Sequence, residues 1–470
     1  MVPARSGPGL RTVARSRIGR SLLTAFLALA CAATTLGAVV TIVARPDGPH
    51  PGYVVVAPAL RPLPVGDGST RVLTGVHDHA AYAIEVPPVW NGDLVLYAHG
   101  FVGNGPELVA EPPGFGLRER LLRQGYAWAA SSYDRNGYDV GAGVRSTAAL
   151  AERFRTLVDA PRRTYLVGTS MGGHIAVRSI EEHPERYSGV LALCGALGDH
   201  ALFDYRLDVQ LSAQALAGVR AYPPDAGYAE TALPRVYAGL GLRPGDPVIS
   251  SPVAAQLRDA VVRLSGGPRP GDLVAFSAWK DFLLGLGVPD DGVGPVTGIA
   301  RDPMSIAGNV GRDYAPDAPI DLDAVVQRVP VADEAARADR GLAPIAQVLG
   351  RPPVPVLALH DLGDLYVPFS MEQVYAADVA ANGRSGLLVQ RAIRATGHCE
   401  FSAAEVATAW DDLVRWVGSG ERPAGDDVLS PAAVADPEYG CRFSDPAAYA
   451  SARAPSERDT RRLYEPCPAG

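Results

Sequence analysis

A serine in a glycine-rich turn is the residue of this sequence best suited to covalent chemistry. Ser170 lies in the segment GTSMGG, residues 168–173, and this Gly-x-Ser-x-Gly pattern is typical of a sharp turn that exposes a serine hydroxyl between a strand and a helix. Residues 164–167 are short and apolar enough for a buried strand, and residues 173–180 can continue as a helix. The pattern alone is not specific, so the interpretation of Ser170 as a nucleophile depends on partners elsewhere in the chain.

A serine nucleophile needs a base, and His398 is the histidine placed best to supply it. The base must reach the hydroxyl and must itself be oriented by an acid, and in chains with this turn the order is serine, acid, histidine. His398 lies in the segment ATGHCEF, residues 395–401, which comes just after the last strand-like run, residues 387–393. The other histidines after the serine lie on the helix of the turn, at the start of a long helical interval or ahead of any acid in their own loop: His174, His183, His200 and His360.

The acid that would orient this base is expected after the preceding strand-like run, residues 354–359. Asp364 is favoured because Gly363 permits a bend before it and Pro368 stiffens the chain after it. Asp361, which lies earlier in the same loop, stays open as the alternative.

Two backbone N–H groups are predicted to stabilise the negative charge that develops on the substrate oxygen. One belongs to Met171, directly after the serine. The other belongs to Phe101, in a loop with His99 and Gly100 that follows the strand-like run 93–98. Glycine frees the backbone of this loop, and we interpret His99 as a residue that packs it.

The composition is that of an ordinary globular protein and narrows the range of partners. The 470 residues are 47% apolar and 20% charged with a net charge of −8, so a nucleic-acid partner has no electrostatic support. The sequence has no Walker loop and no Gly-x-Gly-x-x-Gly after a strand. His77 and His79 share one face of an extended segment, but no third ligand is near them, so we interpret both as surface residues. The predicted chemistry requires no cofactor and no metal, and its partner is a small-molecule ester or amide; the oligomeric state is not indicated.

Residues 1–43 are predicted to be a signal sequence or a signal anchor. An uncharged run, residues 21–43, is long enough to span a bilayer and is preceded by five arginines: Arg5, Arg11, Arg15, Arg17 and Arg20. Positive charge before an apolar run places the start of a chain in the cytoplasm and the rest outside. We therefore expect a secreted protein, or one anchored to the outer face of the cell membrane if the segment is not cleaved.

Export changes the interpretation of the cysteines, because disulfides form and persist outside the cytoplasm. Apart from Cys31 in the signal region, the chain has four: Cys194, Cys399, Cys441 and Cys467. Four cysteines predict two disulfides, for which three pairings are open.

Strand-like and helix-like segments alternate along most of the chain, which predicts an α/β fold with a mostly parallel sheet. The predicted core comprises residues 71–198 and 353–420, with a linker at 44–70 and a tail at 421–470. Residues 199–352 lack a strong strand and are too long for a loop, so we interpret them as a large helical cap inserted between late sheet strands. The predicted core strands are 81–86, 93–98, 126–131, 164–167, 189–193, 354–359 and 387–393, and the predicted core helices are 116–124, 146–158, 171–183, 370–382 and 403–417.

One apolar stripe at helical spacing in the cap has two interpretations. Its members are Phe276, Trp279, Phe282, Leu283 and Leu286. Such a stripe can line an apolar pocket or pack the cap onto the core, and packing is the favoured interpretation.

Taken together, these pieces resemble the α/β-hydrolase superfamily. The resemblance covers about residues 70–200 and 353–420, and its pieces occur in the family's order: His99-Gly100-Phe101, the turn around Ser170, Gly363-Asp364 with Val367-Pro368, and Gly397-His398. It implies an α/β-hydrolase fold, mostly parallel sheet flanked by helices, with Ser170, Asp364 and His398 as the catalytic triad.

The resemblance also implies a disulfide pairing. Cys194 and Cys399 look like a pair found in some exported bacterial members, which would tie the cap entrance to the histidine loop. Cys441 and Cys467 are then expected to close a short loop in the tail. Feruloyl-esterase and tannase-type members place a cysteine directly before the serine, where this chain has Thr169, so that subgroup is not assigned.

Three functions stay open at this point. The first is an exported serine hydrolase that cleaves carboxylic esters through an acyl-enzyme. The second is an amidase or peptidase that uses the same triad, as exported amidases of the phthalyl-amidase kind do. The third is a non-catalytic exported scaffold used for binding.

Overall fold

The structure is a computed structural model and describes residues 48–246, 249–287, 305–314 and 319–450, together with Arg461 and Cys467. These residues belong to one compact unit, Asp47–Gly470. Residues 1–43, for which an export segment is predicted, lie outside the described residues. Within the described ranges, no helix is both long and apolar enough to cross a membrane.

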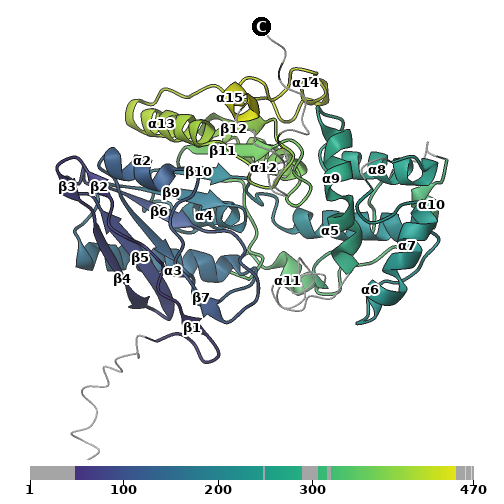
Figure 1. The fold of residues 1–470 in the computed structure, drawn as a ribbon, viewed down its shortest axis with the longest axis horizontal. Helices are drawn as coiled ribbons and strands as arrows, with labels where there is room; N and C mark the ends of the chain where they lie inside the picture. Colours follow the sequence, from purple (N-terminus) through teal and green to yellow (C-terminus); the bar gives the residue numbers. More distant parts are fainter. Residues whose placement is uncertain are drawn as a thin grey trace, which may run out of the picture. The chain divides into compact units, whose positions relative to one another are not determined.

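An eight-stranded sheet forms the centre of this unit, in the order β4-β5-β8-β6-β9-β10-β11-β12 (Figure 1). The pairs β4–β5 and β5–β8 are antiparallel, and all other pairs are parallel. The strands are β4 (Arg71–His77), β5 (Ala80–Val86), β6 (Asp93–Ala98), β8 (Ala127–Ser131), β9 (Arg163–Thr169), β10 (Gly189–Leu193), β11 (Val356–Asp361) and β12 (Leu388–Ile393). Most of them are buried along their whole length, as expected of strands covered on both faces.

Strand β4 was not predicted, and its place in the sheet explains why. It is an edge strand, and its segment RVLTGVH mixes exposed and half-buried residues instead of forming an apolar run. The turn to β5 contains Asp78 (φ 48°) and His79 (φ 67°). His79 donates through Nδ1 to the carbonyl of Gly48 at 2.7 Å. This hydrogen bond holds the segment at Gly48 against the turn.

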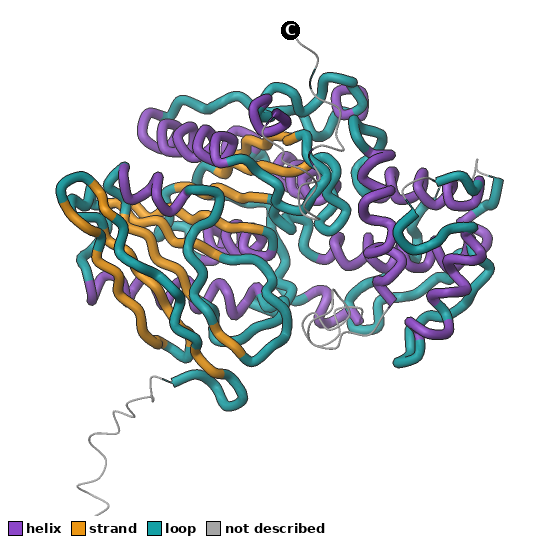
Figure 2. Tube along the Cα trace, viewed as in Figure 1, coloured by secondary structure: helices purple, strands orange, loops and turns teal. Residues whose placement is uncertain are grey.

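Five helices cover the two faces of the sheet: α3 (Val140–Leu157), α4 (Met171–Glu182) and α12 (Ser370–Ala381) on one, α2 (Leu117–Arg123) and α13 (Ala403–Ser419) on the other (Figures 1 and 2). Alternate residues of one strand serve the two faces. On β6, Leu94 packs in the cluster that holds Phe154 of α3, whereas Val95 packs in the cluster that holds Trp410 of α13. The sheet is therefore the middle layer of a three-layer α/β structure.

Helix α3 begins at Val140, six residues before the predicted start at 146. The segment 140–143 contains two glycines, which weakened the sequence signal for a helix, yet Asp139 caps it by accepting from the N–H of Ala142 at 2.8 Å. Glycine is required here: a Cβ on Gly141 would lie 2.1 Å from the carbonyl oxygen of Leu342. The close approach lets the end of the cap segment pack directly onto α3.

Helices fill the interval between β10 and β11 in the described part of the chain (Figure 1). They are α5 (His200–Leu216), α6 (Tyr228–Thr231), α7 (Leu233–Leu240), α8 (Pro252–Leu264), α9 (Asp272–Leu284), α10 (Leu322–Val325) and α11 (Glu334–Ala338). Residues 332–349, where an amphipathic pattern predicts a helix, are helical only at α11. Beyond it the backbone pairs with α3 instead, since Val140 donates to the carbonyl of Pro344 at 2.8 Å.

The tail lies against the edge of the sheet at β12. The N–H of Asp426 donates to the carbonyl of Gln390, and the Asp426 carboxylate accepts from the N–H of Ala392, both at 2.8 Å. A disulfide joins Cys441 to Cys467 across a separation of 26 residues. These contacts cover an edge strand that would otherwise present unpaired backbone groups.

Candidate active site

Ser170 occupies a tight turn between β9 and α4. Its backbone is in a left-handed region that non-glycine residues rarely adopt, with φ 59° and ψ −121°. The turn depends on its glycines: a Cβ on Gly168 would lie 2.0 Å from the carbonyl oxygen of Gly172, and a Cβ on Gly172 would lie 1.9 Å from that of Ala98. The sequence pattern around Ser170 therefore has a steric cause, because only glycine lets strand, turn and helix approach this closely.

The structure brings Ser170, Asp364 and His398 together from the ends of three parallel strands. His398 Nε2 lies 2.8 Å from Ser170 Oγ, and His398 Nδ1 lies 2.6 Å from Asp364 Oδ2. A carboxylate only accepts, so Nδ1 carries the proton and Nε2 of the neutral ring accepts from the serine hydroxyl. This is the arrangement in which an imidazole can take the hydroxyl proton.

The backbone of its own loop holds the Asp364 carboxylate in place. Oδ1 accepts from the N–H groups of Tyr366 at 2.8 Å and Val367 at 3.0 Å, which leaves Oδ2 for His398. The carboxylate is fully buried, so water does not compete for it. The turn that follows β11 thus aims this acid at the imidazole.

Asp361, the alternative acid of the sequence analysis, lies elsewhere in the same network. Its Oδ2 accepts from the N–H of Glu400 at 2.7 Å. Burial, followed by the nearby charge of Asp364, raises the pKa of Asp361 well above its ordinary value. Asp361 therefore anchors the loop that carries His398, and the geometry assigns the contact with the imidazole to Asp364.

A buried histidine stands behind the Asp364 loop. His360 donates through Nε2 to the carbonyl of Val367 at 2.8 Å, and its Nδ1 lies 3.2 Å from Glu372 Oε1. Burial alone would lower the pKa of His360, but the hydrogen bond and charge of Glu372, together with the charge of Asp364, raise it overall. His360 precedes any acid in its own loop and so is not expected to be the base; its hydrogen bond to Val367 instead holds the acid loop in place.

The two predicted oxyanion donors belong to segments that adjoin the serine. Met171 is the first residue of α4, so its N–H has no carbonyl partner within the helix. The loop that carries Phe101 passes close to the nucleophile, since a Cβ on Gly100 would lie 3.1 Å from Ser170 Cβ. His99 is buried and stacks on Tyr133 at 4.1 Å between ring centroids, which packs this loop.

A disulfide lies next to the imidazole. Cys194 follows β10, Cys399 follows His398, and their Cα atoms are 5.2 Å apart. The two sulfur atoms and His398 are close enough together to suggest a metal site, but thiolates are the metal ligands and these sulfurs are bonded to each other. The cluster is a crosslink that ties the His398 loop to the centre of the sheet.

Breaking this crosslink by a double change, Cys194→Ser with Cys399→Ser, is expected to lower kcat/KM by about 10- to 100-fold, because small displacements of a catalytic group cost that much. Steady-state hydrolysis of an aryl ester measures it. The matched control removes the other disulfide, Cys441→Ser with Cys467→Ser, and is expected to leave kcat/KM within a few-fold. An equal loss in both variants would contradict a specific role for the disulfide beside His398.

The acid loop and the cap contribute side chains that the sequence did not assign to the site. Tyr366, two residues after the acid, has its ring centroid 4.8 Å from that of His398. Phe282 of α9 packs on Tyr366 at 5.1 Å, and Trp279 donates through Nε1 to the carbonyl of Thr396 at 2.7 Å. The apolar stripe therefore divides. One part touches the acid and histidine loops, and the members buried within the cap are Phe276 and Leu283 of α9 and Leu286, which follows α9.

His174 lies one turn beyond Ser170 on α4 and is fully buried. Its Nε2 donates to the carbonyl of Ala346 at 2.7 Å, and its Nδ1 accepts from the hydroxyl of Tyr138 at 3.1 Å. Burial lowers the pKa of His174 to about 4. The folded protein therefore requires a neutral ring at this position.

Acid is expected to destabilise the protein through His174. In the unfolded chain this histidine binds a proton below its ordinary pKa of about 6.5, whereas in the folded chain it does so only below about 4. Its contribution to the free energy of unfolding is therefore lost as the pH falls from about 6.5 to about 4. Between pH 7 and pH 5 the loss from this one group is about 2 kcal/mol. Urea unfolding at both pH values is expected to show a smaller pH dependence for His174→Gln than for the wild type. Equal pH dependence in the two proteins would contradict this account.

The fold is defined by the strand order together with the serine turn after β9, the acid loop after β11 and the histidine loop after β12. They make up an α/β-hydrolase fold, with helices on both faces of a mostly parallel sheet.

The proteins to which this chain is similar include an amidase and an esterase. No protein-family model matches it. It is 23% identical over 415 residues to an o-phthalyl amidase of Xanthobacter agilis, over 76% of this chain and 89% of that protein. Among solved structures it is similar to an esterase from Aspergillus oryzae (14% identity, TM-score 0.45, 76% of this chain and 82% of that chain). It is also similar to a proline iminopeptidase of Mycobacterium smegmatis (12% identity, TM-score 0.35, 75% of this chain and 100% of that chain).

Proposed function

We propose that this protein is a serine hydrolase that cleaves carboxylic esters through an acyl-enzyme, with Ser170 as the nucleophile, His398 as the base and Asp364 as the orienting acid. The observation that carries the proposal is the continuous relay from Ser170 Oγ to His398 Nε2 at 2.8 Å and from His398 Nδ1 to Asp364 Oδ2 at 2.6 Å. A serine, an imidazole and a buried carboxylate in this geometry are what acyl transfer requires.

Each step has a residue to perform it. Ser170 Oγ attacks the carbonyl carbon while His398 Nε2 takes its proton, and the negative oxygen receives hydrogen bonds from the N–H groups of Phe101 and Met171. His398 returns the proton to the leaving group, which departs and leaves an ester on Ser170. A water molecule then repeats the sequence and releases the acid.

Amide cleavage by the same residues is the second candidate. The observation that favours it is the similarity to an o-phthalyl amidase, which extends over 76% of this chain. Amides have poorer leaving groups than aryl esters, so protonation by His398 matters more in their cleavage. Hydrolysis of a 4-nitroanilide at a rate comparable to that of the matching 4-nitrophenyl ester would make amides the better description.

The acyl-enzyme is tested with two aryl esters that share one acyl group but differ in their leaving group. If both pass through the same intermediate, added methanol captures the same fraction of acyl groups from each ester. Different fractions would contradict a common intermediate. No turnover of any ester or amide by the folded, disulfide-bonded protein would favour the non-catalytic scaffold.

We also propose that the protein acts outside the cytoplasm. The support is the basic and then apolar character of residues 1–43 and the presence of two disulfides, which persist in oxidising compartments. Mass analysis of the N-terminus of the protein from its natural source distinguishes cleavage from retention. Recovery of the full chain in the cytoplasm with reduced cysteines would contradict export.

A further inference from the structure

A buried arginine of the cap has donors with no acceptor. Arg206 of α5 is only 2% exposed. Its Nη2 donates to the carbonyl of Tyr366 at 3.2 Å, but its Nε and Nη1 are buried without a hydrogen-bond partner in the described part of the protein. A guanidinium is always charged, so this cation is both out of water and incompletely bonded.

The carboxylates on the same helix are engaged with other partners. Asp204 pairs with Arg337 at 2.7 Å, and Asp208 pairs with Arg312 at 2.8 Å. Among the described residues, ion pairs therefore balance the charges of Asp204 and Asp208, but none balances the charge of Arg206. An uncompensated buried charge is strongly unfavourable, so a protein that retains one is expected to use it.

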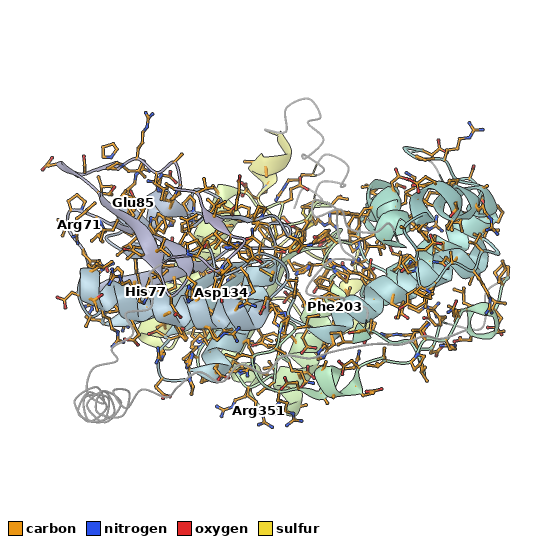
Figure 3. All side chains as sticks on the ribbon, turned by 90° about the horizontal axis from the view of Figure 1, so that it is seen from below. Arg71, His77, Glu85, Asp134, Phe203 and Arg351 are labelled. Carbon is orange, nitrogen blue, oxygen red and sulfur yellow. A yellow bond between two sulfur atoms is a disulfide. The ribbon has the colours of Figure 1, made fainter. Side chains whose placement is uncertain are left out.

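Arg206 lies close to the reacting groups. Its guanidinium carbon is 4.9 Å from the ring centroid of Tyr366, and that ring packs on His398 at 4.8 Å. The guanidinium also lies over the ring of Phe203 at 5.8 Å, the residue that Figure 3 labels between the core helices and the cap helices. One aromatic ring thus separates the cation from the imidazole that contacts Ser170.

We propose that Arg206 is a specificity-determining residue that binds a carboxylate on the substrate, so that the preferred esters or amides carry a carboxylate near the bond that is cleaved. This inference rests on the proposed function. The planar guanidinium matches a carboxylate in geometry, and a single negative charge compensates a single arginine. The aromatic rings around it suit an acyl or leaving group with an apolar body.

Binding of a small carboxylate tests the proposal without requiring turnover. Benzoate and benzamide have the same shape, but only benzoate is charged. Benzoate is expected to raise the Tm of the wild type more than benzamide does, and Arg206→Met is expected to abolish the difference while Arg206→Lys retains part of it. The matched control is Arg337→Met, which removes a cap arginine that is already paired and is expected to keep the preference for benzoate.

Kinetics supply the second readout. Both compounds are tested as inhibitors of 4-nitrophenyl acetate hydrolysis. The inhibition constant of benzamide divided by that of benzoate is expected to exceed 10 in the wild type and to fall to about 1 in Arg206→Met, even if the substitution changes the turnover rate. The ratio, unlike turnover, is insensitive to a merely structural role. An unchanged ratio in a folded Arg206→Met protein, or equal effects of the two ligands on the wild type, overturns the proposal. If the wild type binds benzoate but does not hydrolyse 4-nitrophenyl acetate, the result counts against the proposed function and not against this inference.

Discussion

Replacing Ser170 with alanine is expected to lower kcat/KM by about 10⁵-fold or more, because removal of the serine of such a triad abolishes the covalent route and leaves only binding and oxyanion stabilisation. The fold is expected to survive, since the change removes one oxygen whose partner is His398 Nε2. Steady-state hydrolysis of a 4-nitrophenyl ester measures the loss, and thermal unfolding checks the fold.

A second serine on the same helix provides the control. Ser179 of α4 is fully buried, and its hydroxyl has no hydrogen-bond partner within the described residues. Ser179→Ala is therefore expected to leave kcat/KM within a few-fold of the wild type. Comparable losses at 170 and 179 would mean that disturbance of α4, and not loss of a nucleophile, explains the result.

Asp364→Asn is expected to lower kcat by about 10⁴-fold, the effect known when the acid of such a triad becomes an amide. The amide can present N–H to Nδ1 of His398, which favours the tautomer that cannot accept from Ser170. The carboxylate also stabilises the imidazolium that forms as the serine attacks, and a neutral amide does not. The measurement is kcat with saturating ester across pH 6 to 9.

Asp361→Asn makes the comparison sharp, because the two acids lie three residues apart in one loop. Asp361 accepts from a backbone N–H at 2.7 Å, and burial raises its pKa, so its surroundings favour the charged form less than water does. An amide oxygen can keep that hydrogen bond, and we expect a loss of less than about 10-fold. If Asp361→Asn were the more damaging change, the assignment of the acid would be wrong.

Much of the candidate site could be predicted because its residues follow strands that the sequence indicates by apolar runs. Buried parallel strands read as apolar runs, and the residues that follow them meet at one edge of the sheet. That logic led to Ser170, Asp364 and His398 from three separate segments. It left Asp361 open, because sequence order does not reveal which of two acids in a loop is held by backbone N–H groups and which faces the imidazole.

The contact between the cap and the acid loop could not be predicted in the same way. The side chain of Arg206 donates to the carbonyl of Tyr366, which lies 160 residues later in the sequence, and no periodicity links the two residues. Arg206 reads in sequence as one more arginine on an amphipathic helix, and only its burial and its unpaired donors set it apart. Strand β4 was missed for a different reason: an edge strand with one exposed face has a weak apolar signal.

Intact-mass analysis of the folded, disulfide-bonded protein after treatment with a fluorophosphonate shows whether Ser170 is an activated nucleophile. We expect a single adduct on the wild type, mapped to Ser170, and no adduct on Ser170→Ala. No adduct on the wild type, or an adduct that persists in Ser170→Ala, would contradict the assignment of Ser170 as an activated nucleophile.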